Sequence, residues 1–274
     1  MRVGAASLAV VALACASVPG ATPAAQPAAA SRHPIRIVPG TTRYRSVSYT
    51  HVEREVSGQP QHSHEVRVFF LTASLASQGA NLHVTFTVDS VARYDMGPAP
   101  SGIERMRAVT FTGTLGPDGE IHDLAGGDST NHAVAELADG LSHLYPRIPS
   151  RGLEPGAQWT DTTQTTSRTG AFPLTVVAVS QHWADPPTGA GPEGAIPIRT
   201  VTSYTFSGQG SQGGQAFSVK GEGRRYTVEL LGLAGVFQRM VSADTSSFTV
   251  TLPALDLTIP GRQTRADTLS LLPE

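Results

Sequence analysis

The sequence predicts an all-β dominated fold, in which one main helix covers a large curved antiparallel sheet or half-barrel. Three features of the 274-residue chain indicate this class. Apolar and polar residues alternate over 81–91, so that Leu82, Val84 and Phe86 share one face of a strand. Glycine-rich turns join long segments rich in threonine and valine. One segment alone of the mature chain shows helical spacing.

The start of the chain has the pattern of an export leader. One arginine, Arg2, precedes an apolar run from about Val3 to Ala14, which is too short to span a bilayer as a permanent helix. We expect residues 1–16 to form a signal peptide and residues 17–34, rich in alanine and proline, to form a flexible tether. Residues 35–274 are then expected to form a single antiparallel β domain.

Cys15 is the only cysteine, and the four residues "ALAC" that end with it resemble the lipobox of bacterial lipoproteins. Two outcomes stay open. Lipidation of Cys15 would anchor the protein to a membrane, whereas ordinary cleavage of the leader would release it. In both cases the mature chain has no disulfide, so the fold depends on packing and strand pairing.

The expected strands follow the alternation along the chain. They lie at about 42–56, 64–76, 81–91, 105–115, 119–124, 157–168, 172–183, 196–208, 215–231, 235–251 and 262–271. Such long strands present more apolar surface than one helix can cover. We therefore expect the sheet to curl on itself, to pack on another sheet or to enclose a ligand.

The helix is expected near residues 129–145. Val134, Leu137 and Leu141 have helical spacing, residues 128–130 offer an N-cap, and Pro146 ends the run. The helix divides the strands into two groups, and the proline- and glycine-rich segment 146–156 leads into the second. Trp159 begins that group, where we expect it to pack against the core.

Composition and motifs exclude several functions. The net charge is -2, and the arginines are interspersed with acids, so no nucleic-acid partner is expected. Gly208, Gly210 and Gly213 match a dinucleotide-binding pattern, but a strand-like segment follows them, which indicates a hairpin tip. The sequence contains no nucleophile elbow, P-loop or zinc-protease motif. We expect no cofactor and no enzymatic activity.

Two groups of histidines and acids are candidate metal ligands. His62 and His64 would share one face of a strand, and His83 lies on the strand expected to pair with it, so three imidazoles could bind zinc or copper. The alternative is that they are polar residues on a solvated face, and we expect no bound metal. The second group is His122, Asp123, Asp128 and His132, whose aspartates are explained by turns and capping.

The order of elements resembles a known family. A leader, paired strands ending in "GPDGEIHDLAG", a helix and then "YPRIPSRGLEPGAQWTDT" are similar to a family of uncharacterised bacterial cell-envelope proteins. The architecture is also similar to the lipoprotein carriers LolA and LolB and to LppX-like lipid binders. That resemblance implies a curved sheet around an apolar cavity for acyl chains. It supplies no catalytic residues.

Three hypotheses follow for function. The first is an exported, non-enzymatic envelope protein that binds a lipid-like apolar or amphiphilic ligand and is periplasmic, associated with the outer membrane or secreted. Its candidate ligand contacts are the alternating aromatics Phe86, Tyr204, Phe206, Phe217 and Phe248, which could equally fill a core. The second is a structural or protein-interaction module with a packed core and an unidentified partner. The third is an enzyme with a dispersed site.

Overall fold

The structure is a computed structural model that describes residues 34–56, 58–94, 106–128, 131–167, 172–189, 194–212 and 214–273. The expected signal peptide, Cys15 and the tether as far as His33 lie outside the described residues, as does Gly213.

Within this part of the chain the protein is mostly β, with a single short helix. The elements in order are β1 (Gly40–Val56), β2 (Gln59–Gln78), β3 (Asn81–Tyr94), β4 (Thr110–Leu115), β5 (Ile121–Gly126), α1 (His132–Ser142), β6 (Gln158–Ser167), β7 (Leu174–Ala184), β8 (Ala195–Gln212), β9 (Gln215–Gly232), β10 (Phe237–Leu252), the 3-10 turn η3 (Pro253–Leu255) and β11 (Leu257–Leu271). No helix among the described residues is long and apolar enough to cross a membrane.

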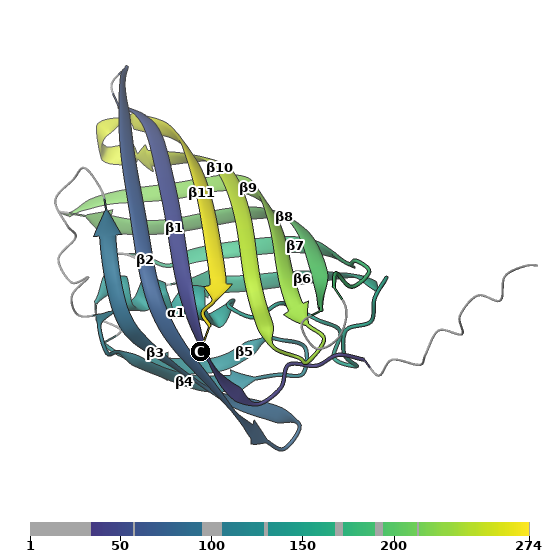
Figure 1. The fold of residues 1–274 in the computed structure, drawn as a ribbon. Helices are drawn as coiled ribbons and strands as arrows, with labels where there is room; N and C mark the ends of the chain where they lie inside the picture. Colours follow the sequence, from purple (N-terminus) through teal and green to yellow (C-terminus); the bar gives the residue numbers. More distant parts are fainter. Residues whose placement is uncertain are drawn as a thin grey trace, which may run out of the picture. The chain divides into compact units, whose positions relative to one another are not determined.

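All strands of the described segments belong to one antiparallel sheet of eleven strands, in the order β5-β4-β3-β2-β1-β11-β10-β9-β8-β7-β6. Figure 1 shows the sheet curving, with α1 behind the long strands. The group of strands before the helix and the group after it are joined where β1 pairs with β11, for example at Tyr44 and Leu271. The predicted fold class, a curved antiparallel sheet with one helix, is confirmed.

The face of the sheet that packs against α1 is called the inner face below. Val134 and Leu141 of the helix are buried there, with Leu137 packed beside them, as the sequence predicts. The strands contribute Tyr44, Phe69, Leu71, Val84, Phe86, Phe111 and Leu269 to the same core. Each large apolar side chain so buried contributes roughly 1.5–3 kcal/mol to folding.

A second, smaller core lies beside the linker after the helix. Ile148 and Leu153 of the linker are buried against Ile196, Ile198 and Leu231 of β8 and β9. Trp159 packs against this cluster, which confirms its predicted structural role.

Beyond these cores, the inner face of the long strands carries buried polar side chains beside aromatic ones. Thr200, Ser242, Asp244 and Ser246 all point inward and are buried. The opposite, outer face exposes Tyr226, which is 49% accessible, together with Tyr49, Val177, Val179, Val228 and Val241. On these strands, exposed apolar side chains of the outer face therefore alternate with buried polar side chains of the inner face. The uncovered apolar surface lies outside the curve.

The N-cap of the helix lies one residue after the segment expected to supply it, residues 128–130. Asn131 is the N-cap, and its side-chain oxygen accepts a hydrogen bond from the backbone N–H of Ala133 at 3.0 Å. Residues 129 and 130 lie outside the described residues, and Asp128 contributes its backbone carbonyl, which accepts from the Asn131 N–H.

Candidate functional site

Phe86, the first of the aromatics expected to contact a ligand, lies in the main core. Its side chain is 0% exposed, and it is the register partner of Ala73 and Phe111. Its ring is 6.2 Å from that of Tyr145, centroid to centroid. Phe86 therefore fills the core and offers no surface to a ligand.

The other four expected contacts lie on the inner face and are partly buried. Each is the register partner of a glycine: Tyr204 of Gly223, Phe206 of Gly221, Phe217 of Gly210, and Phe248 of both Gly221 and Gly261. A Cβ placed on Gly221, Gly223 or Gly261 would collide with the facing ring. These rings thus lie across glycines of the neighbouring strands. They pack on the sheet itself, and the glycines are required to admit them.

A charged group holds Tyr204 in place. Its hydroxyl donates to Asp244 Oδ1 at 2.6 Å, and Arg225 Nε donates to Asp244 Oδ2 at 2.8 Å. Burial and the neighbouring carboxylate raise the pKa of Tyr204 to about 12, so the phenol remains a hydrogen-bond donor. The arrangement satisfies buried polar groups and fixes the inner face.

The outer face carries an open groove of about 590 Å³ across β7 to β11. Its outward-facing lining is Val177, Val179, Ser203, Thr205, Glu222, Arg224, Thr245, Ser247 and Arg262. The two valines, 40% and 43% exposed, form an apolar wall. The guanidinium of Arg224 lies 4.9 Å from the ring centroid of Tyr226, a cation–π contact that orients it. The groove thus combines an apolar wall with two arginines and one carboxylate.

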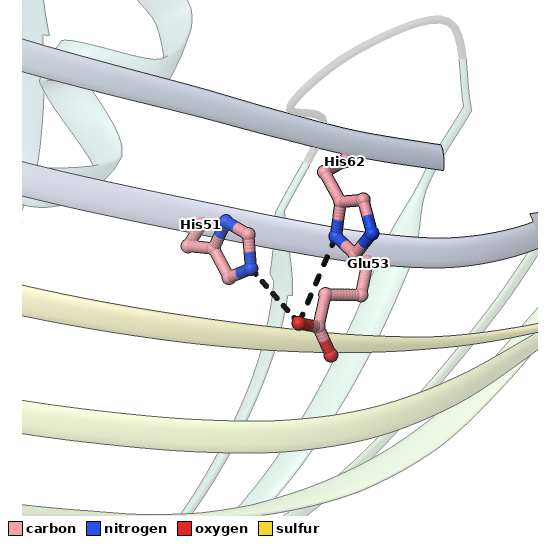
Figure 2. Close-up of side chains that lie close together, drawn as sticks. All are labelled: His51, Glu53 and His62. Carbon is pink, nitrogen blue, oxygen red and sulfur yellow. Dashed lines mark hydrogen bonds and ion pairs between the residues drawn. The ribbon is translucent and has the colours of Figure 1, made fainter. Parts of the chain in front are cut away.

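A cluster of histidines lies on the same face, on β1 and β2 (Figure 2). His51 Nε2 is 3.0 Å from Glu53 Oε1, and His62 Nδ1 is 3.7 Å from the same oxygen. The far nitrogen of His51, Nδ1, is 2.9 Å from His64 Nδ1. The hydrogen bond to His51 is the main reason that the pKa of Glu53 is lowered. Ligand atoms of His51, Glu53 and His62 all lie within 4.8 Å of one another, so this trio could hold a metal ion.

The structure changes the expected histidine group. His62 and His64 do share a face, but the third expected partner is wrong. His83 pairs with Ala76 and Thr114, far along β2 and β3 from His64. The register instead brings His51 opposite His64. No spacing along the chain indicates this, because it depends on how β1 pairs with β2.

The second expected group is also rearranged. His122 has ligand atoms within 4.8 Å of those of Asp118 and Glu120, while Asp123 and Asp128 are not part of this trio. The side chain of His132 is outside the described residues. Glu120 is engaged by Arg147 at 2.6 Å, and Asp118 Oδ1 accepts from the Glu120 backbone N–H at 3.1 Å. These contacts stabilise the β4–β5 turn.

Comparison with known proteins finds no matching protein family and no matching curated protein. Among solved structures, Neisserial surface protein A (NspA) matches with a TM-score of 0.24 and 8% identity, over 84% of this chain and 98% of that chain. Acinetobacter baumannii OccAB3 matches with a TM-score of 0.28 and 6% identity, over 85% and 99%. Pseudomonas aeruginosa OccK2 in complex with glucuronate matches with a TM-score of 0.27 and 10% identity, over 85% and 98%.

These findings correct the family expected from the sequence. The resemblance to uncharacterised envelope proteins is wrong, since no family matches the chain. The resemblance to LolA, LolB and LppX-like carriers is wrong as well, because no curated protein matches the chain. At these TM-scores the likeness carries no conclusion about activity or ligand.

Proposed function

We propose that this chain is an exported, non-enzymatic cell-envelope protein that binds a small amphiphilic ligand in the outer groove. The observation that carries the proposal is the lining of that groove, where exposed Val177 and Val179 lie across three strands from Arg262. Its volume, about 590 Å³, lies within the usual range of small-molecule sites. The export leader predicted over residues 1–16 supports a location in the cell envelope.

The chemistry of the lining defines the ligand class. Covering the two valines removes apolar surface from water and favours an apolar chain or ring at that end. Arg224 and Arg262 can donate paired hydrogen bonds to a carboxylate or phosphate. Glu222 is two residues from Arg224 on β9 and lies in the same register row as Arg262, with Ser247 between them. It can accept from a hydroxyl or amine of the ligand. An amphiphile with an anionic head group and a hydrogen-bond donor fits this set.

Titration with a fluorescent fatty acid tests the proposal. Val179→Glu places a charge on the apolar wall and should weaken binding at least about tenfold, since that charge must be desolvated. Val241→Glu is the matched control, because Val241 is similarly exposed on the outer face but does not line the groove. The groove is not the binding site if the parent protein does not bind the fatty acid, or if Val179→Glu and Val241→Glu weaken binding equally.

A second candidate, a protein-interaction module, is favoured by the exposed apolar residues outside the groove. Tyr226, Val228 and Val241 lie side by side on β9 and β10, and a partner sheet could cover them. In that case Val241→Glu should abolish complex formation, and the fatty acid should not compete.

A further inference from the structure

The trio His51, Glu53 and His62 is held by regular strand pairing. Residues 51 and 53 are two apart on β1 and so share a face, and Glu53 is the register partner of His62 on β2. The side chains of His51, Glu53 and His62 are 19%, 49% and 51% accessible. An ion in solution can therefore reach all three without any opening of the fold.

The spacing of the ligand atoms suits a small divalent metal. Bonds of about 2.0 Å in tetrahedral geometry place the ligand atoms about 3.3 Å from one another. The separations of 3.0 Å and 3.7 Å from Glu53 Oε1 to the two imidazole nitrogens lie on either side of this value. Small side-chain rotations, without backbone movement, would complete the site. In the metal-free chain a proton on His51 Nε2 bridges to Glu53, and a metal ion can replace that proton.

His64 has the position of an orienting partner. A histidine that binds metal through one ring nitrogen usually donates its other N–H to an acceptor, which fixes the ring and its tautomer. His51 Nδ1 lies 2.9 Å from His64 Nδ1, and the Tyr49 hydroxyl lies 3.1 Å from the same atom of His64. An unprotonated His64 Nδ1 has one lone pair, which can accept the N–H of His51, and the Tyr49 hydroxyl approaches the same atom. The rings of His51 and His64 also stack, with centroids 4.2 Å apart.

We propose that His51, Glu53 and His62 form a binding site for a divalent transition metal ion, zinc or copper, with His64 as a positioning residue. Two imidazoles and a carboxylate are a common ligand set for these metals, and they leave a coordination position for water or an anion. The sequence-based expectation of no metal rested on spacing along the chain, and the site depends on strand register instead. The Asp118, Glu120 and His122 trio is a weaker candidate, because Arg147 already neutralises Glu120.

Isothermal titration of the untagged mature protein with Zn²⁺ and with Cu²⁺ tests the site. The expected result is one equivalent bound to the parent, with His51→Gln and His62→Gln each lowering affinity at least about tenfold. His64→Gln should lower affinity more weakly, as loss of an orienting partner does. His83→Gln is the matched control, since His83 is an exposed histidine outside the trio, and it should bind like the parent.

A spectroscopic measurement identifies the ligands. Electron paramagnetic resonance of the Cu²⁺ complex should show nitrogen hyperfine structure from two imidazoles, reduced to one in either single variant. Several results would overturn the proposal: no binding of either metal at micromolar concentration, unchanged binding in the His51→Gln/His62→Gln double variant, or loss of binding in His122→Gln. Circular dichroism of each variant confirms that the exposed substitutions leave the sheet folded.

Discussion

Replacement of Glu229 by glutamine should stabilise the protein by an amount that grows with pH. Glu229 points to the inner face, is 7% exposed, and has Ile198 and Met240 as its register partners. Burial raises the pKa of its carboxyl group from 4.5 to about 8. The carboxyl is therefore protonated in the folded state near neutral pH and ionised in the unfolded chain.

The magnitude follows from linkage. Between the unfolded pKa of 4.5 and the folded pKa of about 8, the folded protein binds one proton more than the unfolded chain. Stability is therefore full below the unfolded pKa and falls by about 1.4 kcal/mol for each pH unit up to the folded pKa. At about pH 7 the accumulated loss is roughly 3 kcal/mol. Glutamine is uncharged at every pH and removes this loss.

Urea unfolding of parent and variant, followed by tryptophan fluorescence from about pH 5 to pH 8, measures the effect. The two proteins should be nearly equally stable at the acidic end and diverge toward the alkaline end. Glu222→Gln is the control, because Glu222 lies on the same strand but points outward and is exposed. A stability difference for Glu229→Gln that does not change with pH, or one matched by the control, would refute the reasoning.

Four further changes test the packing, each by urea unfolding. Gly221→Ala should destabilise by roughly 1–3 kcal/mol, because its Cβ would meet the Phe206 ring and a backbone carbonyl, whereas Gly140→Ala, in an open helical position, should stabilise by about 0.5–1 kcal/mol. Asn131→Ala should cost about 1 kcal/mol through loss of the helix N-cap. Phe86→Trp should overpack the main core and cost roughly 1–3 kcal/mol, with unchanged fatty-acid binding; a loss of binding without destabilisation would place Phe86 at a ligand.

The fold was predictable because its determinants are local. Alternation over 81–91 fixes which residues of β3 face the core, and Val84 and Phe86 are both fully buried. The spacing of Val134 and Leu141 fixes the contact face of the helix in the same way. Neither inference requires knowledge of which strands are neighbours.

The candidate sites were not predictable because they depend on register. His51 meets His64 only through the pairing of β1 with β2, and one residue of slip would turn His51 to the inner face. The groove brings together Val179, Arg224 and Arg262 from three strands that no local pattern links. In the sequence, Phe206 and Phe248 suggested a cavity. Gly221 lies between them in the sheet, and both rings pack on glycine backbone.

The metal site and the groove share one row of the outer face, which leads to a last prediction. His62, Glu53, Arg262, Ser247 and Glu222 are successive register partners across β2, β1, β11, β10 and β9. Neighbouring strands are about 4.8 Å apart, so an anionic head group at Arg262 would lie about one strand spacing from a metal held by Glu53. Zn²⁺ should therefore raise the affinity for a fatty acid, because it adds positive charge next to the bound carboxylate. His51→Gln should abolish that gain and leave the metal-free affinity unchanged. If zinc leaves the affinity of the parent unchanged while both ligands bind, the groove and the metal site act independently.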